Sequence, residues 1–299
     1  MNNILLQSYD IMLLIIYQIK LIVPFWIVGL ALGAFLSSHK DKIIDIIIHR
    51  FKLKIGRFPQ LLLAAVLGVV CPINVQGVLP IIAFLASINV NEGSIAAFLF
   101  TSVLINPNLI IYSMVLGIEV MLIRLLLCIF LGVTAGILIS VFYKEKKFFN
   151  FEGFEDDPII SEKKAKITQF YYNFKKAVKK TAPNLLIGML LTVLFEKYFP
   201  QEIFNYIFLN NRALSVLFMA SLGVPLYFCG GGVIPLLKLW LDNGMSIGSA
   251  AAFMITGPAT KFNNLSGIKV VTNHKNFIIY ILFNIVFAVA AGTIIDFIL

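Results

Sequence analysis

Charged residues are scarce in this sequence. Of its 299 residues, 13% are Asp, Glu, Lys or Arg and 60% are hydrophobic, and the mean hydropathy is +0.93. The apolar share of soluble globular domains is only about 45–50%. This composition therefore excludes an ordinary soluble domain and predicts an all-α, polytopic membrane protein.

Cysteine and histidine are also rare, with three residues of each. Cys71, Cys128 and Cys229 all fall in apolar surroundings, and no CxxC pair is present, so neither a disulfide framework nor a metal knuckle is predicted. The apolar runs contain no HExxH motif, acid pair or P-loop. We therefore expect no enzymatic activity, no cofactor and no bound metal.

The excess positive charge lies in two segments between apolar runs. The chain has 24 Lys and Arg against 15 Asp and Glu, and the basic residues concentrate in residues 38–60 and 143–180. Loops rich in Lys and Arg remain on the cytoplasmic side of a membrane. This pattern predicts a multi-pass protein of the cell (inner) membrane, in contact with the lipid bilayer, and argues against a nucleic-acid partner.

The chain contains an internal duplication. A shift of about 155 residues pairs Gly68 with Gly223, Thr101 with Thr256 and about ten further identical positions without a gap. We expect a first membrane repeat at residues 1–142, a cytoplasmic linker at 143–176 and a second membrane repeat at 177–299.

The two cytoplasmic segments constrain how the first repeat crosses the membrane. Three apolar runs, 61–88, 95–117 and 121–142, separate them, and three full crossings would place the two segments on opposite sides. As one helix, 61–88 would be about 42 Å long, against a hydrocarbon core of about 30 Å, and Cys71-Pro72 and Gly77 interrupt it. We expect a re-entrant broken-helix hairpin there, and hence two inverted repeats of three spans plus a hairpin. Eight full spans in parallel repeats are the alternative.

In the second repeat the hairpin is expected at residues 213–241, between spans at 184–199 and 250–271, with a last span at 277–297. The first span of the chain is expected at 25–37. Lys238 and Asp242 are predicted to pair along one helix face. Thr101 and Thr256 are expected to bond to the backbone of their own helices.

Interruptions at matching places in two halves indicate a transporter's binding site, because unwound backbone offers amides and carbonyls to a solute. A structural role is the alternative for each group of residues. The Gly and Pro residues would allow close helix packing, and the Asn residues would hydrogen-bond between helices. Lys261 would extend its ammonium group to the membrane surface, and the thiols would act as small apolar side chains. The substrate-binding candidates are Cys71, Asn74, Gln76, Gly77, Pro80, Asn106 and Asn108 in the first repeat, and Cys229, Gly230, Gly231, Gly232, Pro235, Pro258, Thr260, Lys261 and Asn263 in the second. Gly257-Pro258 is expected to interrupt its helix as Asn106-Pro107 does.

The turns Gly77-Val-Leu-Pro80 and Gly232-Val-Ile-Pro235, together with Gly257-Pro-Ala-Thr260-Lys-Phe-Asn263, resemble the predicted permeases of the ArsP/YraQ type. The resemblance covers roughly residues 10–140 and 175–298. It implies solute export, and in one branch of the family the export of trivalent organoarsenicals.

The leading hypothesis is therefore a permease that exports a small solute, such as a trivalent (organo)arsenical or another thiophilic compound. Thiols at the hairpin tips, Cys71 and Cys229, would suit such a solute. The alternative is a non-catalytic membrane subunit that acts with a partner protein. The sequence predicts no oligomeric state.

Overall fold

The computed structural model describes residues 56–71, 75–143, 147–151, 167–176, 205–209, 211–227 and 233–299, and scattered single positions at 12–50 and 178–202. At Gln76, Gly77 and Pro80 it describes the backbone only. The described residues form helices joined by short connections, with one isolated antiparallel bridge between Phe149 and Thr272. About half of the expected span at 25–37 and most of the one at 184–199 lie outside them.

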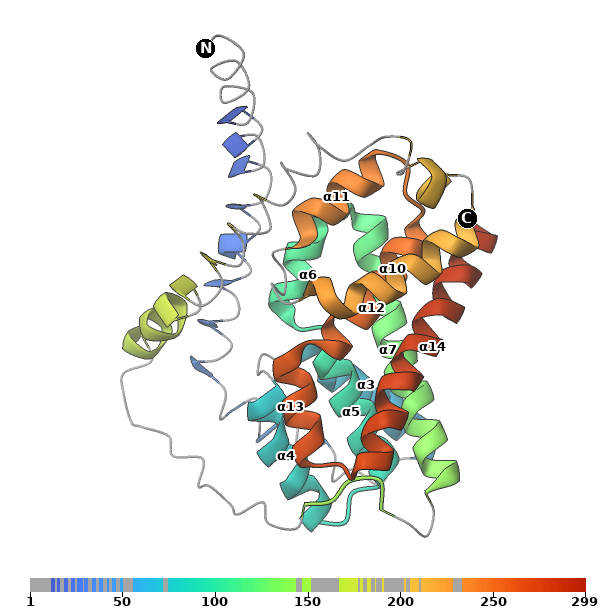
Figure 1. Ribbon diagram of the computed structural model, residues 1–299. Coiled ribbons are helices and arrows are strands. Elements are labelled where there is room, and N and C mark those ends of the chain that lie inside the picture. Colours follow the sequence, from blue (N-terminus) through green and yellow to red (C-terminus); the bar gives the residue numbers. More distant parts are fainter. Residues whose placement is uncertain are drawn as a thin grey trace.

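The helices occur in the same order in both copies (Figure 1). The first copy has α3 (Arg57–Val70), α4 (Val75–Ser87), α5 (Glu92–Leu104), α6 (Pro107–Ser113), the 3-10 turn η1 (Met114–Leu116) and α7 (Ile118–Phe142). The second has a π-helical turn η2 (Asn205–Leu209), α10 (Arg212–Leu226), α11 (Ile234–Asp242), α12 (Ile247–Thr260), α13 (Phe262–Val270) and α14 (His274–Ile298).

Several helices begin at a polar side chain that caps them. Asn91, Asn106, Asn211 and Asn273 each accept a hydrogen bond from a backbone N–H in the first turn of α5, α6, α10 and α14. These side chains satisfy donors that have no partner inside the helix. Short polar residues between apolar runs therefore fix where the helices start.

The predicted interruptions of the hairpin runs are confirmed. The run 61–88 ends one helix at Val70 and begins the next at Val75, and the corresponding run ends α10 at Leu226 and begins α11 at Ile234. The run 95–117 also breaks, with an angle of 45° between Glu92–Leu104 and Pro107–Leu116.

The expected interruption at Gly257-Pro258 is misplaced, because α12 continues through Pro258 and ends at Thr260. Side chains satisfy the carbonyls around this proline. Thr260 Oγ1 donates to the Thr256 carbonyl at 2.7 Å, and Asn264 Nδ2 donates to the Pro258 carbonyl at 2.8 Å. Neither bond replaces the donor that Pro258 removes, whose acceptor in a regular helix would be the Met254 carbonyl.

Helices α5 and α12 form the centre of the molecule. Every residue of α5 from Gly93 and of α12 from Gly248 is buried, as expected for a helix that is apolar all round. Within each copy the central helix packs against the helix before the first break, α3 or α10, and against the last helix, α7 or α14.

Matching glycines allow these close approaches in both copies. A Cβ on Gly68 would lie 3.0 Å from the Thr101 Cβ, and one on Gly223 would lie 3.1 Å from the Thr256 Cβ. The residues of these two contacts are those that the 155-residue shift pairs. Small residues at helix crossings let backbones approach inside a membrane. The duplication in sequence is therefore also a duplication of helix packing.

Of the described helices, α7 and α14 are individually long and apolar enough to cross a membrane, and the bent α5–α6 pair adds a third candidate. Each exposes large apolar side chains, such as Phe130 at 58% on α7 and Val286 at 65% on α14. A soluble protein would bury such rows, whereas lipid favours them. The outer faces of α7 and α14 are thus suited to acyl chains.

The two long helices run antiparallel. Tyr143, at the end of α7, donates to Asn276 Oδ1, at the start of α14, at 2.9 Å. Midway along both helices the rings of Phe130 and Phe287 lie 5.7 Å apart. The first residues of the expected linker belong to the same packed end of the molecule, because Asn276 Nδ2 donates to the Phe148 carbonyl at 2.7 Å.

Candidate functional site

The first pair of breaks separates α3 from α4 and α10 from α11. Cys71 follows α3 directly and is completely buried. Pro235 lies in the first turn of α11 and is buried. Asn74 and the second-copy candidates Cys229, Gly230, Gly231 and Gly232 lie outside the described residues.

Gln76, Gly77 and Pro80 lie inside α4 rather than in unwound backbone, because this helix begins at Val75. The first turn of a helix has backbone N–H groups without intrahelical acceptors, and its end has a partial positive charge. The groups that the break offers near Gln76 and Gly77 are therefore helix N-terminal amides. The first turn of α11, next to the second break, offers the same kind of donor.

The second pair of breaks separates α5 from α6 and α12 from α13. In the first copy Asn106 caps α6, with its Oδ1 accepting from Leu109 N at 2.9 Å. Asn108 Oδ1 is buried and has no hydrogen-bond partner. In the second copy α12 ends at Thr260 and Lys261 forms the junction with α13.

The matched asparagines of this second pair have different surroundings. Asn108 is half-buried, whereas Asn263 is exposed. The polar side chain that bonds to the second-copy break is Asn264, which the sequence analysis did not select. Asn108 and Asn263, which the 155-residue shift pairs, therefore have different environments.

The two copies meet through their broken helices (Figure 1). Helix α4 packs against α13, and α11 packs against η1, which continues α6. A Cβ on Gly267 of α13 would lie 2.9 Å from Val75 Cγ1 at the start of α4. Both contacts join the two copies. In each, the helix that follows the first break in one copy (α4 or α11) touches the segment that follows the second break in the other copy (α13 or η1).

The sequence analysis missed a buried cation. Arg124, on α7, is 1% exposed, and its Nη1 donates to Ser113 Oγ at 2.5 Å. Its Nε and Nη2 have no hydrogen-bond partner. A buried donor without an acceptor costs about 1–3 kcal/mol. The signal was available, since Arg124 is the one basic residue in the run 121–142.

Two phenol groups near the same broken helices are also unsatisfied. Tyr112, on α6, and Tyr227, at the end of α10, are 5% and 4% exposed, and neither hydroxyl has a partner. The two tyrosines belong to one buried cluster with the start of α11. Within the described residues, polar groups without partners therefore occur on α6, on α7 and at the end of α10.

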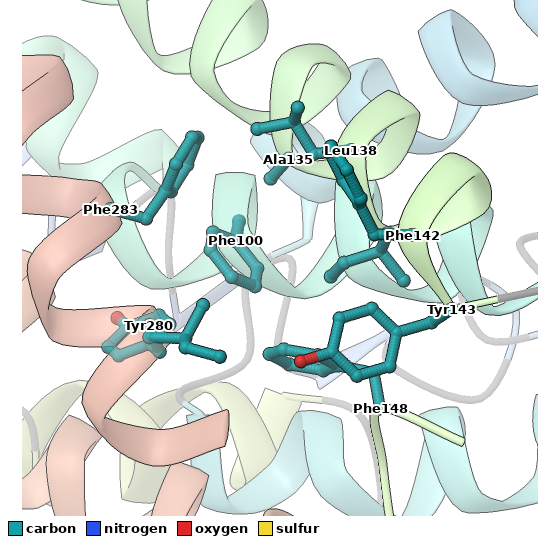
Figure 2. A pocket seen from close by; sticks show the side chains of 10 residues that line it. Phe100, Ala135, Leu138, Phe142, Tyr143, Phe148, Tyr280 and Phe283 are labelled. Atoms are coloured by element: carbon teal, nitrogen blue, oxygen red, sulfur yellow. The ribbon is translucent and has the colours of Figure 1, made fainter. Parts of the chain in front are cut away.

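A separate apolar pocket of about 300 Å³ lies between α5, α7 and α14. Figure 2 shows Phe100, Phe283 and Phe148 around it, with Tyr143 at one side. Its lining is almost entirely carbon, so it suits an apolar chain better than a polar solute. Among the described residues, no three His, Cys, Asp or Glu side chains come close enough to hold a metal ion.

Broken helices between two packed halves, with lipid-facing helices outside them, characterise a membrane transporter. The chain belongs to the ArsP_1 family of predicted permeases, whose family model matches residues 8–297. It is also similar to the UPF0718 protein YcgR of Bacillus subtilis (strain 168), with 36% identity over 76 residues. That alignment covers 25% of this chain and 26% of the relative. No solved structure matches the chain.

Proposed function

We propose that this protein exports a small solute across the cell membrane, and that its two repeats have opposite orientations and rock around the paired breaks. The observation that supports the proposal best is the exchange of contacts between copies, α4 with α13 and α11 with η1. Non-helical backbone inside a membrane is tolerated where protein covers it or where it lines a water-filled cavity. Breaks that lie at these contacts become accessible to the solute when the two repeats move apart there.

The direction of the long helices supports inverted repeats. α7 and α14 occupy equivalent places, since each follows a second break and packs against the buried central helix of its own copy. They run antiparallel, as the contact of Tyr143 with Asn276 requires. Eight full spans in parallel repeats would make equivalent helices run in the same direction.

The lengths of the half-helices support re-entrant hairpins. α3 has 14 residues and α4 has 13, which correspond to about 21 and 20 Å at 1.5 Å per residue. Neither reaches across a hydrocarbon core of about 30 Å. Each hairpin would then enter and leave on the same side, and the basic segments at 38–60 and 143–176 would both be cytoplasmic.

Transport itself is tested with the purified full chain in lipid vesicles. A growth screen of a sensitive host against arsenicals, antimonials and thiols first selects the solutes, and flux of each selected solute is then measured in the vesicles. Flux with the chain alone is the expected result. Flux that appears only after a partner protein is added would instead identify a subunit, and no flux with any selected solute would refute export.

A thiophilic solute would bind to Cys71 and Cys229. Cys71→Ser and Cys229→Ser should then each lower resistance to a trivalent organoarsenical, and the double variant should lower it further. Cys128→Ser is a matched control, because Cys128 is a buried thiol on α7 away from the breaks. Resistance that is unchanged in the double variant would exclude binding through these thiols.

A further inference from the structure

Arg124 is a buried cation on α7. It is the seventh residue of α7, about 9 Å from the start of that helix at 1.5 Å per residue. Its acceptor, Ser113 Oγ, is neutral and itself donates to the Leu109 carbonyl at 2.5 Å. Within the described part of the chain, no carboxylate pairs with this guanidinium. Glu119, on the same helix, is exposed.

The duplicated fold does not need a cation at this place. Gly136 on α7 lies close to the Gly93 carbonyl of α5, and Gly292 on α14 lies equally close to the Gly248 carbonyl of α12. The same offset pairs Arg124 with Tyr280. Tyr280 is equally buried, and its hydroxyl donates to the Ala259 carbonyl at 3.0 Å. The second copy thus fills the position with a satisfied neutral side chain.

The remaining unsatisfied groups lie on neighbouring elements. Tyr112 immediately precedes Ser113, the residue that Arg124 contacts, and Asn108 lies one turn earlier on α6. Tyr227 approaches from the other copy, beside Gly257 of α12. α11 contacts η1, and Ile234, the first residue of α11, belongs to the same buried cluster as Tyr112 and Tyr227.

We infer that these residues bind the anionic group of the transported solute, a carboxylate or a similar oxyanion. The Nε and Nη2 donors of Arg124 form a fork that matches two oxygens of such a group. The hydroxyls of Tyr112 and Tyr227 add one donor from each copy, and the N-terminus of α11 adds a favourable dipole. The inference rests on the proposed export function, because an anion reaches these buried groups only when the contact between η1 and α11 separates.

The first test is the thermal stability of the full chain in a neutral detergent. The probes are acetate, phosphate, methylphosphonate, benzoate and phenylphosphonate, and benzamide is the uncharged control. We expect at least one anion to raise the melting temperature of the wild-type protein, with no effect of benzamide. Arg124→Met should abolish this shift, and Arg57→Gln, at an exposed arginine, should retain it.

The same variant separates a binding role from a structural one. If Arg124 exists for binding, Arg124→Met removes an uncompensated buried charge and should melt at the wild-type temperature or higher without an anion. A structural arginine would make this variant melt lower. Should it fail to fold, Arg124→Lys keeps the charge and loses the fork, and should weaken the anion effect. An anion shift unchanged in Arg124→Lys, or absent from the wild-type protein, would overturn the inference.

Two further arms identify the source of the oxyanion and separate this inference from export. Stabilisation by phosphatidylglycerol, with none by the soluble anions, would assign the site to a lipid head group and refute a solute site. In phosphatidylcholine vesicles, flux of a solute from the growth screen should fall about tenfold or more in Arg124→Met. Unchanged flux in Arg124→Met would refute the anion site but not export. Absence of flux with the wild-type protein would refute export, and the change in melting temperature would then still test anion binding at the site.

Discussion

Rocking of the two repeats requires that α4 and α13 move against each other, and a disulfide between these helices should stop it. A Cβ built on Gly267 lies 3.8 Å from the Cβ of Val75. Disulfides join Cβ atoms about 3.5–4.5 Å apart, with a mean of about 3.8 Å. The pair Val75→Cys and Gly267→Cys therefore meets the distance requirement without backbone movement. The valine methyl that would crowd the new Cβ at 2.9 Å is removed by the same double substitution.

The expected result is a reversible loss of transport. Once formed, the bond holds the two Cα atoms within about 7 Å, so separation of the copies at this contact becomes impossible. Flux in vesicles should fall below about a tenth of its value after oxidation and return after treatment with dithiothreitol, if access to the site depends on this movement. Mass spectrometry of the proteolysed protein verifies that residues 75 and 267 are joined.

A cross-link inside one copy is the matched control. Ser215, on α10, and Ser249, on α12, are buried, and their hydroxyl oxygens lie 2.7 Å apart. Ser215→Cys with Ser249→Cys should form a comparable bond and leave flux unchanged, because both helices belong to the same copy. If the verified 75–267 cross-link transports as fast as its reduced form, the copies do not move against each other there and the rocking mechanism is wrong.

Two further predictions test topology and packing. In a re-entrant hairpin, Ser87→Cys should react with an impermeant thiol reagent from the same side of the membrane as Arg50→Cys, and labelling from the opposite side would identify a full crossing. Gly248→Ala should lower the melting temperature strongly, since its Cβ would lie 2.1 Å from the Gly292 carbonyl oxygen, whereas Gly56→Ala, with its nearest neighbour at 3.6 Å, should have little effect. Equal melting of the two alanine variants would contradict the close packing of the central helices.

The breaks in the runs 61–88 and 213–241 could be predicted from the sequence because their causes are local, whereas α12 continues through Gly257-Pro258. A run too long for one crossing and interrupted by Cys71-Pro72 must end one helix and begin another, and the structure confirms the break there. The pairing of Lys238 with Asp242 is also confirmed, since residues four apart on a helix are neighbours. Such features depend on spacing along one segment and not on the partner helix.

Predictions that depended on neighbouring helices were less successful. Thr256 donates to the Ala252 carbonyl of its own helix, as expected, but Thr101 donates to the Cys128 carbonyl of α7 at 3.4 Å. The same residue at matched positions thus has two different acceptors. Asn264 was missed for the same reason, because its carbonyl acceptor becomes available only when α12 ends next to α13.

The difference between the two copies indicates how an internally repeated scaffold can acquire a specific solute site. Packing contacts within each copy are duplicated, as in the glycines where α5 and α12 cross other helices of their own copy. The unsatisfied groups are not duplicated. Arg124 corresponds to Tyr280, whose hydroxyl is hydrogen-bonded. The shift of about 155 residues pairs Tyr112 with Gly267, which has no side chain. A solute with one charged end has two unlike ends, so a site that recognises the charged end departs from the symmetry of the repeat. Residues that depart from the duplication at the contact between copies are therefore better candidates for solute specificity than residues that obey it.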